Sequence, residues 1–185
     1  TPHIFTMKEL NALFSKADNL KLDLHSPFRH LIIPLMFRML YGCGLRVSEA
    51  THLRVCDVNL VTGILTILDT KFEKDRLVPM DISLTKRCRT YAERLHRISK
   101  PDDFFFQTRD GEHFSRQSVY NAFRQLLWKC GIPYAGRTYG PRLHDFRHTQ
   151  AVHCLKRWVK NGHELSSALP VLSTYLGHTT FEGTS

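Results

Sequence analysis

The stretch RLHDFRH, from Arg142 to His148, places two arginines and two histidines within seven residues at the expected start of a helix. Arginine donates two parallel hydrogen bonds to a phosphate, because its guanidinium group is a planar fork. Histidine takes up or releases a proton near neutral pH. Two interpretations are open at this point: a phosphate site with proton-transfer capacity, or a solvated helix end with no chemical role.

The elements that would position this stretch are mainly helical. The capping pattern of Thr6 and Glu9, followed by apolar residues at helical spacing, predicts a first helix. Further helices are expected on the same grounds, several of them ended by glycine or proline, at 26–42, 46–54, 83–99, 115–131, 144–162 and 164–177.

A change of period separates the early helices from the later ones. The segments 63–68 and 76–80 are short and rich in β-branched residues, which predicts a hairpin with a charged loop, and 57–60 could add a third strand. The segment 103–115 is expected to be a loop with a buried aromatic plug. We therefore expect one mainly α domain with a small three-stranded antiparallel β-sheet.

Composition narrows the class of protein. The chain of 185 residues carries 26 Lys and Arg against 17 Asp and Glu, a formal charge of +9 that favours a polyanionic partner such as nucleic acid. No apolar run approaches the ~18 residues of a membrane span. The five cysteines are scattered and form no CxxC pair, so neither a zinc site nor a disulfide framework is expected, and a reducing cytoplasm is the simplest location.

Four islands of sequence stand in a fixed order along the chain: GLRVSE at 44–49, the K-x-x-K-x-R-L-V-P hairpin at 71–79, H-x-x-R at 144–147, and LGH at 176–178. In these islands the chain resembles the tyrosine recombinases, the phage-integrase family that also includes Xer-type and transposon recombinases. The resemblance covers nearly the whole chain and corresponds to the catalytic domain of those enzymes. It implies their DNA breaking-rejoining fold.

The resemblance implies roles for two arginines and a histidine. Arg46 and Arg147 would stabilise the extra negative charge of the phosphoryl-transfer transition state, a task for preorganised cations. His144 would act as base or donate a hydrogen bond to the phosphate. The plainer alternatives are an Arg46 paired with Glu49 at a helix start and a helix-capping His144.

The hairpin and the last island supply the remaining site residues by the same resemblance. Lys71 would be the general acid that protonates the departing 5′-oxygen, with Lys74 as its rival or as a phosphate contact. His178 would hydrogen-bond the scissile phosphate, unless it merely caps a helix. Glu49 is expected to orient the site rather than to react.

DNA contacts outside the catalytic set are expected from the helix at 115–131. Arg116 is the first candidate, and Gln117 and Arg124 are weaker ones, with a solvated face as the alternative for all three. Arg142 and His148 receive no role from the family, so a solvated face or a contact to the DNA backbone is the default for both.

The nucleophile of the family is a tyrosine about nine residues after the LGH histidine. That position lies just beyond Ser185, and Tyr175 precedes His178, so we expect this chain to lack its nucleophile and to be inactive alone. The N-terminal core-binding domain of the family is also expected to be missing. The fragment would then be monomeric in solution, whereas the family forms tetramers on double-stranded DNA.

The expected activity is site-specific DNA recombination through a 3′-phosphotyrosine intermediate, of the kind used in phage integration or by mobile elements. No metal or cofactor is expected, because the chain has neither a P-loop nor a carboxylate cluster for Mg²⁺. Two alternatives stay open. One is a type IB topoisomerase-like enzyme, and the other is a DNA-binding module derived from a recombinase.

Overall fold

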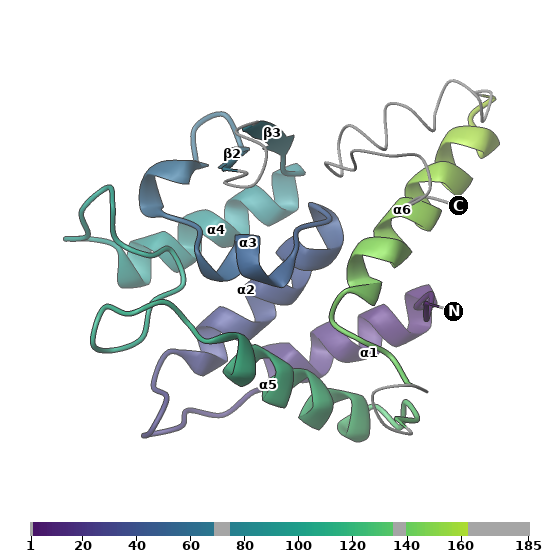
Figure 1. Cartoon of the computed structure of the whole chain (residues 1–185), viewed down its shortest axis with the longest axis horizontal. Helices are drawn as coiled ribbons and strands as arrows, with labels where there is room; N and C mark the ends of the chain where they lie inside the picture. The colour runs from purple at the N-terminus through teal and green to yellow at the C-terminus, as the bar shows by residue number, and fades with distance from the viewer. Residues whose placement is uncertain (1, 69–74, 135–139, 163–185) are drawn as a thin grey trace.

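The computed structural model describes residues 2–68, 75–134 and 140–162 (Figure 1). Its elements follow the predicted order: helices α1 (Met7–Asp18), α2 (Arg29–Gly42) and α3 (Val47–Thr51), a 3₁₀ turn η1 (Val55–Asp57), strands β1 (Val58–Asn59), β2 (Ile64–Ile67) and β3 (Arg76–Pro79), and helices α4 (Ile82–Leu95), α5 (Arg116–Lys129) and α6 (Asp145–Lys160). The mainly helical fold with one small sheet is confirmed.

The sheet has the order β1-β2-β3, with both pairs antiparallel. Leu65 pairs with Val78 and both side chains are buried, because alternate residues of a strand face the same side. Gly63 turns the chain into β2 with φ 70°, and a Cβ there would lie 2.8 Å from the Thr85 hydroxyl oxygen. Glycine is therefore required where the sheet meets α4.

Helix α2 runs through the middle of the molecule, with α1, α4 and α6 packed around it (Figure 1). Four phenylalanines join it to distant segments: the ring centroid of Phe146 lies 5.2 Å from Phe5, 5.4 Å from Phe37 and 5.6 Å from Phe123. Aromatic pairs at such distances bury large areas and restrict ring orientation. The start of α6 is thus fixed against α2, α5 and the N-terminal segment.

The segment 103–115 forms the predicted aromatic plug. Phe105, Phe106 and Phe114 are buried in the main core. The Tyr91 hydroxyl of α4 donates a hydrogen bond of 3.0 Å to the Phe105 carbonyl, which satisfies both groups inside the core. This plug fixes the entry of the chain into α5.

Several boundaries differ from expectation: α4 ends at Leu95 rather than at residue 99, and α3 ends at Thr51 rather than at residue 54. Helix α2 begins at Arg29, three residues after the predicted Ser26, because 23–28 form hydrogen-bonded turns instead. His144 is the N-cap of α6 rather than its first residue, and it makes no side-chain capping hydrogen bond. The helix predicted at 164–177 lies outside the described residues.

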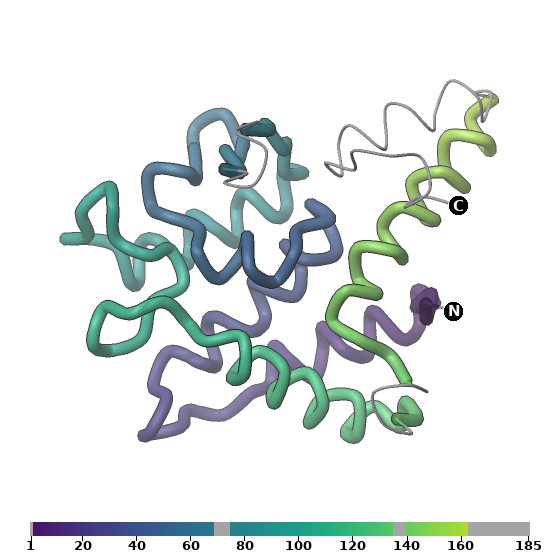
Figure 2. The backbone as a smooth tube through the Cα atoms, in the orientation of Figure 1, coloured from purple at the N-terminus to yellow at the C-terminus, as the bar shows by residue number. Residues whose placement is uncertain are grey.

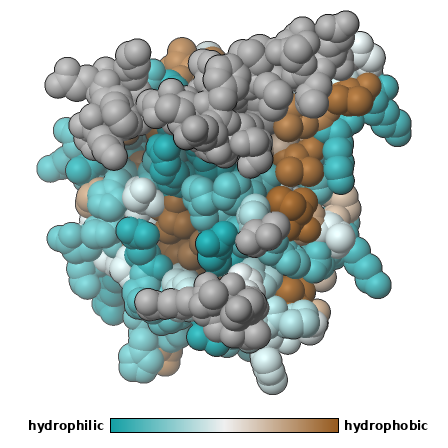
Figure 3. Space-filling view, turned by 45° about the vertical axis from the view of Figure 1, so that its right-hand side comes forward, coloured by the Kyte–Doolittle hydropathy of each residue, from teal (hydrophilic) through white to brown (hydrophobic). Residues whose placement is uncertain are grey.

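Helix α6 carries a second, small apolar cluster, apart from the main core, made of Ala151, Cys154, Leu155 and Trp158. Figure 3 brings this side of the molecule forward and shows a strip of hydrophobic side chains beside a largely hydrophilic face. Within the described part of the chain, none of the helices has both the length and the apolar character needed to cross a membrane.

Candidate active site

Arg46 and Glu49 meet at the start of α3. Arg46 is the N-cap residue, in extended conformation, and its backbone N–H donates 2.7 Å to Glu49 Oε2. Its guanidinium also donates 3.0 Å to Glu49 Oε1. An acidic residue in the first turn satisfies unpaired helix N–H groups and interacts favourably with the helix dipole. The plain reading of Arg46, a helix-start arginine paired with Glu49, is therefore true of its geometry.

A second arginine, Arg76 at the beginning of β3, binds the same carboxylate. Its two terminal nitrogens donate 2.9 Å to Glu49 Oε1 and 2.8 Å to Oε2, the two-point geometry of a guanidinium fork. Sequence reasoning treated Arg76 only as part of the hairpin motif. The sequence carries no signal for this pairing, because it depends on the strand that faces the start of α3 in the folded chain.

Glu49 is ionised at neutral pH. Burial by itself would raise the pKa of its carboxyl group, but the hydrogen bonds and charges of Arg76 and Arg46 outweigh this and hold the pKa below its ordinary value. The predicted orienting residue thus lies at the centre of an ionic cluster that links α3 to the sheet.

Arg147 lies beneath this cluster. It is buried, with 1% of its surface exposed, and so is its neighbour Phe146. Its guanidinium donates 2.6 Å to the carbonyl oxygen of Gly44, so the first turn of α6 lies beside the link between α2 and α3 (Figure 2). Gly44 has φ 60°, a left-handed conformation that favours glycine.

The charge of Arg147 is retained despite its burial. Desolvation, followed by the nearby positive charges of Arg46 and Arg76, lowers its pKa to about 10, while Glu49 opposes this. Arg147 is therefore cationic at neutral pH. A buried guanidinium needs compensating partners, and the Gly44 carbonyl is one.

His144 is exposed at the N-cap of α6 and is uncharged at neutral pH. Desolvation of the ring, then the charges of His148 and Arg147, lowers its pKa to about 4. The ring packs edge-on against His148, with centroids 4.7 Å apart. A neutral imidazole carries one N–H and one ring nitrogen with a lone pair, so it has the groups for either predicted role, base or hydrogen-bond donor to the phosphate.

Arg142 and His148 are the two basic residues of the RLHDFRH stretch that have no expected catalytic role. Arg142 is exposed, its backbone N–H donates 2.8 Å to Asp145 Oδ2, and its guanidinium lies 3.4 Å from Oδ1. Asp145 is fully buried, so this pair secures the helix start. His148 is partly buried against His144, which does not fit a fully solvated face.

A hollow of about 860 Å³ brings the site together with the start of α5. Its lining includes the predicted residues Arg46, His144, Arg116 and Gln117, and also Arg142. Arg124 does not line it; its guanidinium lies 4.1 Å from the ring centroid of Tyr134. The hollow therefore gathers residues from α3, α5 and the start of α6.

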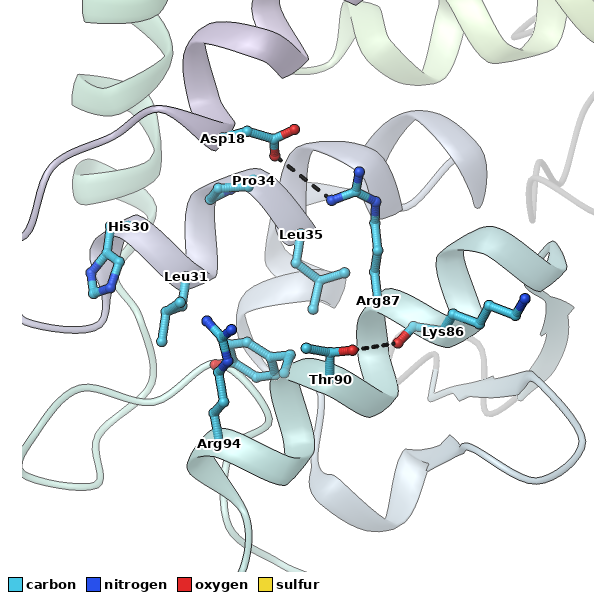
Figure 4. A pocket seen from close by; sticks show the side chains of 10 residues that line it. Asp18, His30, Leu31, Pro34, Leu35, Lys86, Arg87, Thr90 and Arg94 are labelled. Atoms are coloured by element: carbon cyan, nitrogen blue, oxygen red, sulfur yellow. Dashed lines mark hydrogen bonds and ion pairs between the residues drawn. The ribbon is translucent and has the colours of Figure 1, made fainter.

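The remaining predicted residues, Lys71, Lys74 and His178, lie outside the described residues. A different hollow, of about 430 Å³, lies between α1, α2 and α4 (Figure 4). Asp18, Lys86, Arg87 and Arg94 line it, and none of the predicted site residues is among the described residues there.

Comparison with known proteins identifies relatives over the whole chain. The chain is 33% identical over 187 residues to the protein y4rB of Sinorhizobium fredii, covering 96% of this chain and 58% of y4rB. It is 31% identical over 186 residues to the tyrosine recombinase XerC of Chlamydia muridarum, covering 100% of this chain and 53% of XerC. The chain thus spans a little over half the length of these relatives.

Solved structures share the fold. The crystal structure of XerA recombinase superposes with a TM-score of 0.76 at 22% identity, covering 100% of this chain and 59% of XerA. The catalytic domain of bacteriophage HP1 integrase superposes with a TM-score of 0.63 at 24% identity, covering 100% of this chain and 85% of that domain. The predicted tyrosine recombinase catalytic-domain fold is confirmed.

The model of the phage integrase family matches residues 4–185, which include the elements that carry Arg46, Arg76 and Arg147. Sequence relatives, fold and family model agree, and this chain belongs to the phage integrase family.

Proposed function

We propose that this chain is the catalytic domain of a tyrosine-type site-specific DNA recombinase that cleaves and rejoins DNA through a 3′-phosphotyrosine. The observation that carries the proposal is the ionic cluster: within the described residues, the guanidinium groups of Arg46 and Arg76 bind the Glu49 carboxylate, and the charge of Arg147 lies near enough to interact with it. This excess of positive charge is what a phosphate would neutralise.

The reaction needs such a cluster. In phosphoryl transfer, negative charge develops on the non-bridging oxygens, and cations already in place stabilise it without reorganisation. Arg46 is 39% exposed beside the hollow, so of the three cluster arginines it is the most accessible to a DNA phosphate. Arg147 contributes its charge from below.

Proton transfer falls to the other residues of the motifs. His144 is neutral and can accept the proton of the attacking tyrosine. Lys71 serves as the general acid for the 5′-oxygen, Lys74 contacts a phosphate, and His178 hydrogen-bonds the scissile phosphate; all three assignments rest on the family motif. The nucleophile that the family motif implies is a tyrosine after the LGH histidine.

Double-stranded DNA is the proposed partner. A solved XerH recombinase bound to difH substrate shares the fold, with a TM-score of 0.75 at 18% identity, covering 99% of this chain and 49% of XerH. Arg116 lines the same hollow as Arg46 and His144 and is the proposed DNA contact on α5. We propose that four protomers assemble on the DNA, as in the family. A DNA substrate and scattered cysteines fit a cytoplasmic location.

Covalent trapping tests the proposal. The natural full-length protein is incubated with nicked DNA from the ends that flank its gene, and an SDS-resistant protein–DNA adduct is measured. We expect an adduct that requires both Arg147 and the tyrosine that follows His178. The control Arg87→Ala, in the distant hollow, should still form the adduct. Binding without any adduct would favour a DNA-binding module, and supercoil relaxation without strand exchange would favour a topoisomerase.

A further inference from the structure

We infer that Arg76 is a positioning residue for Arg46: by clamping Glu49, it holds the Arg46 guanidinium at the edge of the hollow where the phosphate is bound. This inference rests on the proposed function. No family motif role was assigned to Arg76, and its place in the cluster follows from the geometry alone.

The carboxylate of Glu49 is fully occupied. Oε1 accepts from Arg46 at 3.0 Å and from Arg76 at 2.9 Å, and Oε2 accepts from the Arg46 backbone at 2.7 Å and from Arg76 at 2.8 Å. Each oxygen thus bonds to both arginines. The carboxylate cannot rotate without breaking its hydrogen bonds to both arginines, so Arg76 determines the orientation that Arg46 meets.

Burial separates the roles of the two arginines. The side chain of Arg76 is 12% exposed and that of Arg46 is 39% exposed. Arg46 lines the large hollow and also a neighbouring one between α3 and β2, and the described lining of either hollow does not include Arg76. Arg76 therefore acts through Glu49 rather than on the substrate.

Charge explains why a second arginine is useful here. A partly buried carboxylate demands a counterion, because desolvation penalises the charged form. With Arg76 removed, Arg46 would be the only guanidinium within hydrogen-bonding distance of Glu49 among the described residues, and Coulomb attraction would draw it toward the carboxylate. Arg76 supplies that counterion, which leaves the charge of Arg46 to serve the phosphate.

Arg76 also connects two motifs. It is the first residue of β3, paired with Ile67, and it follows directly on the loop whose sequence contains Lys71 and Lys74. The Arg76–Glu49 pair therefore anchors the end of the hairpin loop to the start of α3. This ion pair thus joins the first residue of β3 to the helix start that carries Arg46.

The test compares Arg76→Gln, Arg76→Lys and the matched control Arg89→Gln in the full-length protein. Arg89 also forms a fork, with two nitrogens 2.8 and 2.6 Å from the Leu60 carbonyl oxygen, and ties α4 to the sheet region away from the site. Adduct formation is measured on DNA with a normal scissile phosphate and on DNA with a methylphosphonate there, which lacks the negative charge.

We expect Arg76→Gln to slow adduct formation by about 100-fold on the phosphate, as for a misplaced catalytic group, and by less than about tenfold on the methylphosphonate. The DNA affinity of Arg76→Gln and the adduct rate of Arg89→Gln should both stay close to those of the parent. Arg76→Lys keeps the charge but lacks the fork, so it should restore little. Equal losses on both substrates, or no loss, would overturn the inference.

A crystal structure of the Arg76→Gln protein separates this inference from the proposed function. If the parent forms no adduct on any DNA, the proposed function fails. The position of Arg46 in the variant structure still tests the positioning role of Arg76. We expect its guanidinium to move onto both oxygens of Glu49. An Arg46 that keeps its single 3.0 Å contact with Oε1 in the variant would refute the positioning role.

Discussion

Among the residues that the structure describes, two carboxylates each contact two arginines, in different settings. Glu49 binds Arg46 and Arg76, and its side chain is 10% exposed. Asp18, at the end of α1, binds Arg38 of α2 through two contacts of 2.8 and 2.7 Å and lies 3.8 Å from Arg87 of α4. Asp18 is 36% exposed and lines the hollow of Figure 4.

The difference shows what turns an ion-pair cluster into a candidate site. The other contacts of Arg38 stabilise the fold: its guanidinium donates to the Pro34 carbonyl and lies 4.8 Å from the Phe14 ring centroid. The Asp18 cluster is thus a joint between three helices. The Glu49 cluster is shielded from water, is close to the buried cation of Arg147, and presents one of its arginines to a hollow.

Removing the buried carboxylate should have the largest effect. Glu49→Ala leaves the guanidinium of Arg76 without its carboxylate partner in a mostly buried position, and we expect a loss of about 3–5 kcal/mol in the free energy of unfolding. Urea denaturation of the 185-residue chain measures it. A loss no greater than that of Asp18→Ala would show that the two clusters do not differ in kind.

Removing Arg147 should separate catalysis from binding. Arg147→Ala deletes a preorganised cation, and we expect the rate of DNA adduct formation to fall by about 10²- to 10³-fold. Arg38→Ala, in the Asp18 cluster, is the comparison and should leave that rate within about threefold, since Arg38 does not line the hollow beside Arg46. A similar decrease in both variants would contradict the distinction between a catalytic Glu49 cluster and a purely structural Asp18 cluster.

Acid should weaken the Glu49 cluster. The pKa of Glu49 is lower in the folded chain than in the unfolded chain, so its contribution to stability is fully present above the unfolded pKa of roughly 4.3. That contribution is lost as the pH falls through the folded pKa. The stability difference between the parent and Glu49→Gln should therefore be constant near neutrality and shrink in acid, and urea denaturation at a series of pH values tests this. A constant difference throughout would be the contrary result.

The smallest effect is expected at the exposed cluster. Asp18→Ala removes a partly exposed ion pair and should cost about 0.2–1 kcal/mol in the free energy of unfolding, and less at high salt. Urea denaturation at low and high salt measures both. A cost above that of Glu49→Ala would reverse the comparison.

The sequence predicted the elements well, because local patterns carry them. The Thr6–Glu9 capping pattern is confirmed: Thr6 Oγ1 accepts from the Glu9 backbone at 3.2 Å, and Glu9 Oε2 accepts from the Thr6 backbone at 2.7 Å. The hairpin and the aromatic plug were also predicted, since β-branched runs and clustered phenylalanines are visible in one dimension. Boundaries such as the start of α2 depended on turn geometry that the pattern does not record.

The site was predicted only in part. Arg46, Glu49, Arg147 and His144 come from spaced motifs, and the structure brings them into one region. Arg76 and the exposure of each arginine could not be predicted. They depend on which strand faces which helix start, a contact between residues 27 positions apart.

The sequence by itself determined the family, the order of the helices and strands, and the set of cationic motif residues. Only the tertiary structure decided that Glu49 binds two arginines, that Arg147 is buried while Arg46 is partly exposed, and that Arg142 secures a helix end. Charge and hydrogen-bonding capacity belong to a residue type, whereas burial and partners arise when distant segments pack, and they set the energy of each charge.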